Sequence, residues 1–195
     1  MDEEQSFVLI DGKRKVMISA PHAVEHTRQG KLRYPEPQTA ELAKALHESM
    51  DCPIIYKTVN AGDDANYDAE CAYKETLAAY VREHYICFLI DLHQMAGFRK
   101  EQICLGTGYG KNLTDASETE QCVQAFERQG LEVSVDSPFA ASYPYTVAAY
   151  IHRECGIPCV QIEINSNLVM QSTPDYAWEQ VLGALEELVD RFAAI

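Results

Sequence analysis

The sequence lacks any apolar run long enough to cross a membrane, since a spanning helix needs roughly 20 consecutive apolar residues. Its opening residues, Met1-Asp2-Glu3-Glu4-Gln5, are acidic where a signal peptide would be basic. Basic residues are also few, because 16 Lys and Arg stand against 30 Asp and Glu, for a formal net charge of -14. Nucleic acids and anionic membranes bind basic surfaces, so we expect neither as a partner.

The seven cysteines include no CxxC pair, which removes the commonest spacing of a structural zinc site. The closest pair, Cys155 and Cys159, brackets Gly156-Ile157-Pro158 and is only a weak candidate for metal binding. Several cysteines lie in apolar runs, as buried thiols do. An odd number of cysteines in this setting favours a reduced, cytoplasmic protein.

Apolar runs and helical patterns alternate along the chain, which at 195 residues is long enough to bury about 70% of its unfolded surface in one domain. The first two predicted strands flank Asp11-Gly12-Lys13 and are expected to pair as a hairpin, and residues 27–38 are expected to form a loop. The alternation predicts one α/β domain over residues 1–195. Strands are predicted at 7–10, 15–18, 53–57, 86–92, 102–105, 131–135 and 158–164, and helices at 39–50, 69–84, 117–129, 146–154 and 174–192.

A histidine and a glutamate lie three residues apart directly after one apolar run. In Ile18-Ser19-Ala20-Pro21-His22-Ala23-Val24-Glu25-His26, the proline cannot continue a sheet ladder, so the strand ends just before His22. An imidazole and a carboxylate at this spacing can bind one metal ion. The pattern alone is weak, because histidines at strand ends are often held by backbone carbonyls.

Another apolar run, Phe88-Leu89-Ile90-Asp91-Leu92-His93, also ends in a histidine. In open α/β sheets, functional sites lie beyond the carboxyl ends of the strands. We therefore predict that His22, Glu25 and His93 bind one Zn²⁺ per chain and leave a position open for water. If the strand persists, Asp91 shares a face with His93 and can orient its ring. His26 is expected beside the ligands or in the pocket.

Glu163 interrupts the apolar run Cys159-Val160-Gln161-Ile162-Glu163-Ile164-Asn165, where a charge is costly unless it is paired or functional. Gln161 and Glu163 share one face of this strand and two isoleucines share the other, so an amphipathic edge strand is the alternative. Beside a metal-activated water, a carboxylate can act as general base and then pass the proton to a leaving amine. We predict this catalytic role for Glu163.

Three segments together resemble the N-formylglutamate amidohydrolase family, a branch of the zinc carboxypeptidase-like hydrolases. The resemblance implies a three-layer α/β/α sandwich with a mixed central sheet. It also implies hydrolysis of an amide next to a carboxylate-bearing amino acid, with an arginine that holds the substrate carboxylate. The segments are Ser19-Ala20-Pro21-His22-Ala23-Val24-Glu25-His26, Asp91-Leu92-His93 and Gln161-Ile162-Glu163-Ile164-Asn165, and their order along the chain also matches.

Arg99 is the preferred arginine for this catalytic role, followed by Arg33 and Arg28, because they follow the two histidine segments. Asn165 and Asn66 are polar residues that can bind substrate, although such residues more often cap or turn the chain. The resemblance implies an N-acyl amino acid as the small-molecule substrate. A carboxypeptidase-type zinc metallopeptidase acting on a short peptide or cell-wall fragment is the alternative, and a non-catalytic binding protein with the same fold is a second.

Overall fold

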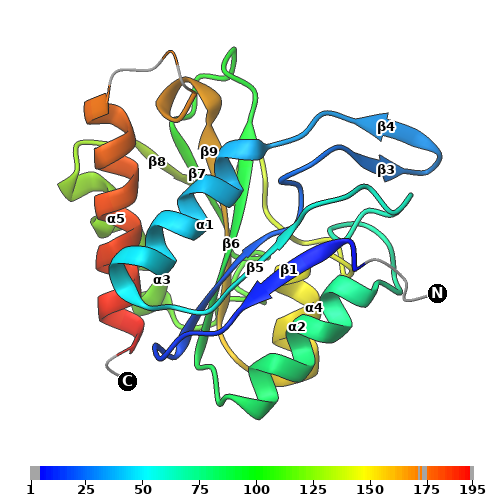
Figure 1. Cartoon of the computed structure of the whole chain (residues 1–195). Coiled ribbons are helices and arrows are strands. Elements are labelled where there is room, and N and C mark those ends of the chain that lie inside the picture. The colour runs from blue at the N-terminus through cyan, green and yellow to red at the C-terminus, as the bar shows by residue number, and fades with distance from the viewer. Residues whose placement is uncertain (1–4, 171, 173–174, 194–195) are drawn as a thin grey trace.

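The computed structural model describes residues 5–170, 172 and 175–193. Figure 1 shows a central sheet with helices on both sides. In these described parts of the chain, no helix has the length and apolarity needed to cross a membrane. The sheet strands are β1 (Phe7–Ile10), β2 (Val16–Ala20), β5 (Ile54–Lys57), β6 (Phe88–Met95), β7 (Ile103–Gly106), β8 (Val133–Val135) and β9 (Cys159–Asn165). The helices are α1 (Pro37–Met50), α2 (Ala72–Glu83), α3 (Ala116–Arg128), α4 (Val147–Cys155) and α5 (Asp175–Ala193), with a 3₁₀ turn at Ser166–Leu168.

The seven-stranded sheet is mixed, with the order β1-β5-β2-β6-β9-β7-β8. Its centre is parallel, because β2 pairs in parallel with β5 and β6, and β6 pairs in parallel with β9. β1 and β7 run antiparallel to their inner neighbours. The carboxyl ends of β2, β6 and β9 therefore meet at one edge, where α/β proteins place their sites.

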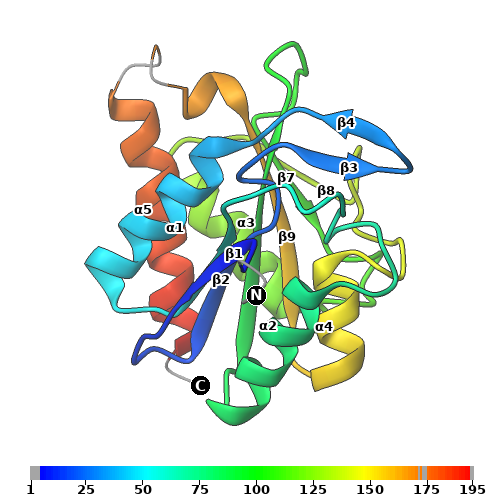
Figure 2. The same ribbon diagram turned by 45° about the vertical axis from the view of Figure 1, so that its right-hand side comes forward.

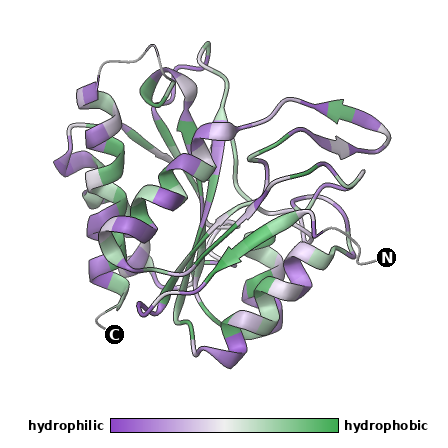
Figure 3. Cartoon of the chain, in the orientation of Figure 1, coloured by the Kyte–Doolittle hydropathy of each residue, from purple (hydrophilic) through white to green (hydrophobic). Residues whose placement is uncertain are grey.

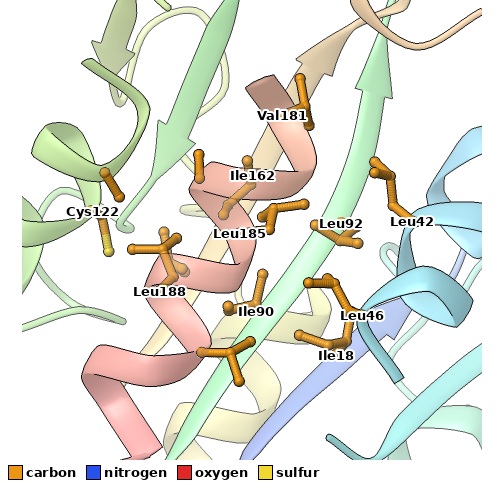
Figure 4. Close-up of a cluster of buried hydrophobic side chains, with 14 of the residues drawn as sticks. Ile18, Leu42, Leu46, Ile90, Leu92, Cys122, Ile162, Val181, Leu185 and Leu188 are labelled. Carbon is orange, nitrogen blue, oxygen red and sulfur yellow. The ribbon is translucent and has the colours of Figure 1, made fainter. Parts of the chain in front are cut away.

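One face of the sheet packs against α1, α3 and α5 (Figures 1 and 2). Alternating residues of the central strands point to this face, so it is continuously apolar. The helices are hydrophobic on their inner sides and hydrophilic on much of their outer surface (Figure 3). The side chains in Figure 4 that fill this core are Ile18, Leu42, Leu46, Ile90, Leu92, Cys122, Ile162, Val181, Leu185 and Leu188.

The other face packs against α2 and α4 and changes character along the strands. Near the amino ends of β6 and β9 it is apolar, where Leu89 and Cys159 join a second core with these two helices. Further along, the same face carries a buried polar set at alternating positions. α2 and α4 thus cover this face with apolar contacts only near the amino ends of β6 and β9. The polar set is Asp91, His93, Gln161 and Glu163.

The predicted hairpin between the first two strands is wrong. β5 lies between β1 and β2, and pairs antiparallel with the first and parallel with the second. Residues 11–15 instead wrap around the end of α1, where the backbone N–H groups of Lys13 and Arg14 both donate to the carbonyl of Asp51. A side chain at Gly12 would lie 2.5 Å from the backbone of Cys52, so this crossing accepts only glycine.

The predicted loop over residues 27–38 contains two short strands. β3 (His26–Arg28) and β4 (Lys31–Arg33) pair around a two-residue turn at Gln29 and Gly30, both with positive φ, which is the geometry that suits a tight hairpin. Figure 1 shows this hairpin projecting from the body of the molecule. The edge-strand alternative for the segment that carries Glu163 is also wrong, because β9 lies between β6 and β7 with every residue buried.

Candidate metal centre and active-site cleft

His22 and His93 converge on the carboxylate of Glu36. His22 Nδ1 lies 3.2 Å from Glu36 Oε1, and His93 Nδ1 lies 3.3 Å from Glu36 Oε2. The two histidines are 3% and 1% exposed. One ligand atom from each of the three residues falls within 4.8 Å of the other two. The structure therefore brings both predicted histidines together.

Glu25 does not join this cluster, which corrects the predicted ligand set. Residues 21–24 form turns and bends rather than a helical turn, and the side chain of Glu25 is exposed. A spacing of three places two side chains on one side only if the backbone between them is helical. Glu36 occupies the third position instead, because its backbone N–H donates to the carbonyl of His22 at 2.8 Å.

The remote ring nitrogens of both histidines rest against buried carboxylates. His22 Nε2 lies 2.9 Å from Asp64 Oδ1, and His93 Nε2 lies 3.1 Å from Asp91 Oδ2. A carboxylate accepts, so each Nε2 carries a proton, and in the neutral ring Nδ1 beside Glu36 is the atom left to bind a cation. Metal-ligating histidines are held in this manner by a carboxylate behind the ring. The structure thus brings Asp91 to His93, where the sequence placed it.

These donors fit a zinc ion. Ligand atoms around a tetrahedral Zn²⁺ at about 2.0–2.1 Å lie roughly 3.4 Å apart, close to the spacing of Glu36 from both rings. Two neutral imidazoles beside a carboxylate would form a set of acceptors, which either protons on the rings or a bound cation balances. Two histidines and one carboxylate are a common ligand set of catalytic zinc.

The electrostatics of the cluster favour a positive charge. Burial lowers the pKa of His22, but the Glu36 carboxylate and the hydrogen bond to Asp64 outweigh it and raise that pKa overall. The pKa of His93 is raised well above its usual value, because Asp91 and Glu36 outweigh burial. Burial raises the pKa of Glu36, yet His22 and His93 lower it overall. Each group stabilises the ionised form of its neighbour.

A second group, made of His22, His26 and Asp64, lies behind the first. His26 stacks on His22 with ring centroids 3.7 Å apart, and burial lowers the pKa of His26 to about 4, so this ring is neutral at pH 7. Arg28 Nε lies 2.6 Å from Asp64 Oδ2 and already neutralises that carboxylate. The second group therefore positions His22, and Arg28 is occupied in supporting it.

Glu163 lies opposite His93 in the register of β6 and β9 and is 7% exposed. Burial raises the pKa of Glu163 to about 7, with His93 opposing the shift. Its Oε1 accepts a hydrogen bond from Gln161 Nε2 at 3.0 Å. A carboxyl group with a pKa near neutrality can both accept and release a proton near pH 7.

A cleft of about 620 Å³ opens over this edge of the sheet, lined by His22, Glu36, His93 and Glu163. Its outer wall is aromatic and basic, with contributions from the β3–β4 hairpin, the loop after β6 and residues 138–146. Tyr67 and Tyr143 stack there at 5.0 Å. The other aromatic and basic side chains of the lining are Arg28, Arg33, Tyr34, Arg99 and Phe139.

Arg33 and Arg99 are the arginines without a carboxylate partner in the described parts of the chain. Arg99 instead places its guanidinium 4.6 Å from the ring centre of Phe139. Both side chains line the cleft. In a protein with 30 acidic residues, these two unpaired guanidinium groups give the cleft positive charge that is available to an anion. The other arginines form ion pairs: Arg14, Arg28, Arg82, Arg128, Arg153 and Arg191.

The two predicted asparagines differ in position. Asn66 lines the cleft, where its Oδ1 accepts from the backbone N–H of Val147. Asn165 lies outside the cleft lining. Its buried side chain donates to the carbonyls of Arg99 and Glu101, and so braces the loop after β6 rather than contacting a ligand.

The residues that sequence reasoning missed are mainly loop residues. Glu36 stands between Pro35 and Pro37 just before α1, and a carboxylate held between two prolines was a usable signal. Asp64 lies in a loop rich in Gly, Asp and Asn that offered several equivalent carboxylates. Gln161 shares its strand face with Glu163, and its role became visible only from its contacts.

Solved structures with the same fold are numerous but distant in sequence. A gene product of Agrobacterium tumefaciens matches with a TM-score of 0.69 and 14% identity, over 98% of this chain and 96% of that one. An N-formylglutamate amidohydrolase from Ralstonia eutropha matches with a TM-score of 0.62 and 13% identity, over 96% and 98%. A succinylglutamate desuccinylase from Chromobacterium violaceum matches with a TM-score of 0.58 and 14% identity, over 94% and 67%.

The chain has an α/β/α fold with a mixed central sheet that it shares with solved carboxypeptidase-like hydrolases, which confirms the predicted fold class. Residues 70–170 match the N-formylglutamate amidohydrolase family, and the chain belongs to that family of amide-bond hydrolases. This confirms the resemblance drawn from the sequence. The matched segment contains His93 and Glu163, whereas His22 and Glu36 precede it. No curated protein matches the sequence.

Proposed function

We propose that this protein is a zinc-dependent amidohydrolase that cleaves the amide bond of an N-acyl amino acid, with Glu163 as general base. One observation carries the proposal: His22, His93 and Glu36 converge on a single buried point that faces Glu163 across two paired strands. Neither the cluster nor the buried carboxylate is explained by stability, because burying charge is costly without a functional return.

The roles follow from the positions of the side chains. His22, His93 and Glu36 would hold Zn²⁺, which when bound lowers the pKa of water and polarises a carbonyl. Glu163 accepts a proton from the attacking water and delivers it to the departing amine nitrogen. A carboxyl group with a pKa of about 7 can perform both transfers near neutral pH.

Arg99 and Arg33 supply the charge that an amino-acid carboxylate requires. We expect Arg99→Met to lower kcat/KM by about 10- to 100-fold, because hydrogen bonds to charged groups are worth about 1.5–3 kcal/mol. Arg33→Met should have a smaller effect, because this side chain lies on the exposed β4. Steady-state kinetics with an N-acyl amino acid measure both. Arg14→Met is the matched control, since Arg14 pairs with Asp190 away from the cleft, and an equal loss there would contradict the assignment.

A short peptide or cell-wall fragment is the second candidate substrate, and the size of the cleft favours it. A further cavity of about 320 Å³ adjoins the first and shares Tyr34, Glu36, Gln94, Met95 and Ala96 with it. Glu36 thus borders space on two sides, enough for a substrate longer than one amino acid. A zinc metallopeptidase of carboxypeptidase type would use the same catalytic residues.

Metal analysis and a substrate screen test the proposal together. We expect protein purified without chelator to contain about one zinc per chain by elemental analysis. The screen compares formyl-, acetyl- and succinyl-amino acids with short peptides, and faster hydrolysis of the acyl amino acids would support the first candidate. Turnover of peptides alone would favour the metallopeptidase. Metal-free protein without hydrolytic activity would support the non-catalytic binding protein instead.

A further inference from the structure

A chain of hydrogen bonds runs from the first turn of α4 to Glu163. The backbone N–H of Val147 donates to Asn66 Oδ1 at 2.7 Å. Asn66 Nδ2 donates to Gln161 Oε1 at 3.2 Å, and Gln161 Nε2 donates to Glu163 Oε1 at 3.0 Å. The three side chains line the cleft. They therefore link the end of a helix to the proposed general base.

The direction of this chain is fixed at its origin. A backbone N–H can only donate, so Asn66 must present its oxygen to Val147 and its amide N–H to Gln161. Gln161 must then accept from Asn66 and donate to Glu163. Neither amide can turn over without placing two acceptors or two donors against each other. The start of α4 also carries a partial positive charge, and every N–H donor of the chain points from that end toward the carboxylate.

We propose that Gln161 and Asn66 are positioning residues that fix the Glu163 carboxylate as an acceptor through Oε1 and leave Oε2 to take the proton from water. The proposal rests on the proposed function, in which Glu163 is the general base. In the described parts of the chain, Oε1 is the oxygen of Glu163 that receives a side-chain hydrogen bond. With one oxygen anchored, the other is held in one place relative to the histidine cluster.

The same loop holds the other half of the site. Asn66 donates its backbone N–H to Asp64 Oδ1 at 2.9 Å, and Asp64 Oδ1 in turn receives His22 Nε2. Residues 64–66 therefore contact the histidine cluster through the side chain of Asp64 and the chain of hydrogen bonds to Glu163 through the side chain of Asn66. Catalysis by water needs the base and the metal ligands in a fixed mutual position, and a misplacement of about 1 Å can cost about 100-fold in rate. This loop sets that position.

Two variants distinguish a role of Gln161 and Asn66 in hydrogen bonding from a role in packing alone. Gln161→Met keeps the length of the side chain and removes its hydrogen bonds. Asn66→Asp keeps the acceptor for the Val147 N–H but removes the donor to Gln161. We expect each to lower kcat about 10- to 100-fold, the range for a lost hydrogen bond to a charged group, with KM and zinc content unchanged. Gln124→Met on α3, which breaks a surface hydrogen bond to Glu120, is the matched control.

The decisive measurement repeats Gln161→Met in a Glu163→Gln background. If Gln161 acts only through Glu163, adding Gln161→Met lowers the residual rate little, because the carboxylate that Gln161 positions is already gone. An equal loss in both backgrounds, or wild-type kcat in both relay variants, would overturn the relay while leaving Glu163 as the base. Full activity of Glu163→Gln itself would overturn the proposed function.

Discussion

Replacing Glu36 by alanine should remove the bound zinc and abolish amide hydrolysis, whereas replacing Glu25 by alanine should change neither. Glu36 faces His22 and His93 at 3.2 and 3.3 Å, and its loss leaves two imidazoles to hold a cation. The exposed Glu25 contributes no atom to the cluster. We expect the loss of metal affinity in Glu36→Ala to exceed the roughly 10- to 100-fold typical of residues behind the ligands.

The two glutamates form a matched pair, because both lie in the segment between β2 and α1 and differ in what they face. Zinc content after dialysis, measured by elemental analysis, and hydrolysis of an N-acyl amino acid give the two readouts. Circular dichroism and thermal unfolding of the metal-free proteins check that both variants fold. Zinc retained by Glu36→Ala and lost from Glu25→Ala would restore the ligand set that the sequence pattern predicted.

His93 and Glu163 could be predicted because long strands carry them, and His22 because it follows β2 closely. β6 and β9 are buried and mostly apolar, so each polar residue within them stands out, and period-two alternation sets the face on which it lies. Asp91 and His93 share a face because β6 persists to Met95. The parallel register then places His93 against Glu163. The alternation within the strands, together with the rule that sites in α/β sheets lie beyond the carboxyl ends of the strands, was sufficient to place these residues.

Glu36 and Asp64 could not be predicted in the same way, because loops carry them. The Glu36 backbone is held by the carbonyl of His22, a contact across 14 residues, and Asp64 reaches His22 across 42. Spacing rules describe only local geometry, so they favoured the nearer Glu25. The wrong prediction of a hairpin has the same cause. β5 comes more than 30 residues later in the chain, lies between β1 and β2 and pairs with one of them on each side.

Glu163→Gln should reduce hydrolysis by about 10²- to 10⁴-fold while zinc content stays at the wild-type level, because proton transfer by a positioned side chain contributes a factor of that size. The amide keeps the shape of the side chain and still accepts from Gln161, so the cleft remains intact. It cannot take a proton from water. Steady-state kinetics and elemental analysis on the same preparation measure both effects, and a loss of zinc with activity would move Glu163 from proton transfer to metal binding.

The same substitution should stabilise the metal-free protein at alkaline pH, which separates function from folding at this residue. Burial raises the pKa of Glu163 from 4.5 to about 7, so the folded state favours the protonated form. The stability that this form provides is complete below pH 4.5 and is lost as the pH rises through 7. Glutamine stays neutral, so above pH 8 the variant should be more stable by on the order of 3 kcal/mol, and below pH 4.5 the two proteins should unfold alike.

Chelator-treated samples in urea titrations at both pH values measure the difference. Equal stability at alkaline pH would show that the carboxylate is compensated within the fold, whereas a gain would show that the chain retains a destabilising charge at the position where the reaction needs a base.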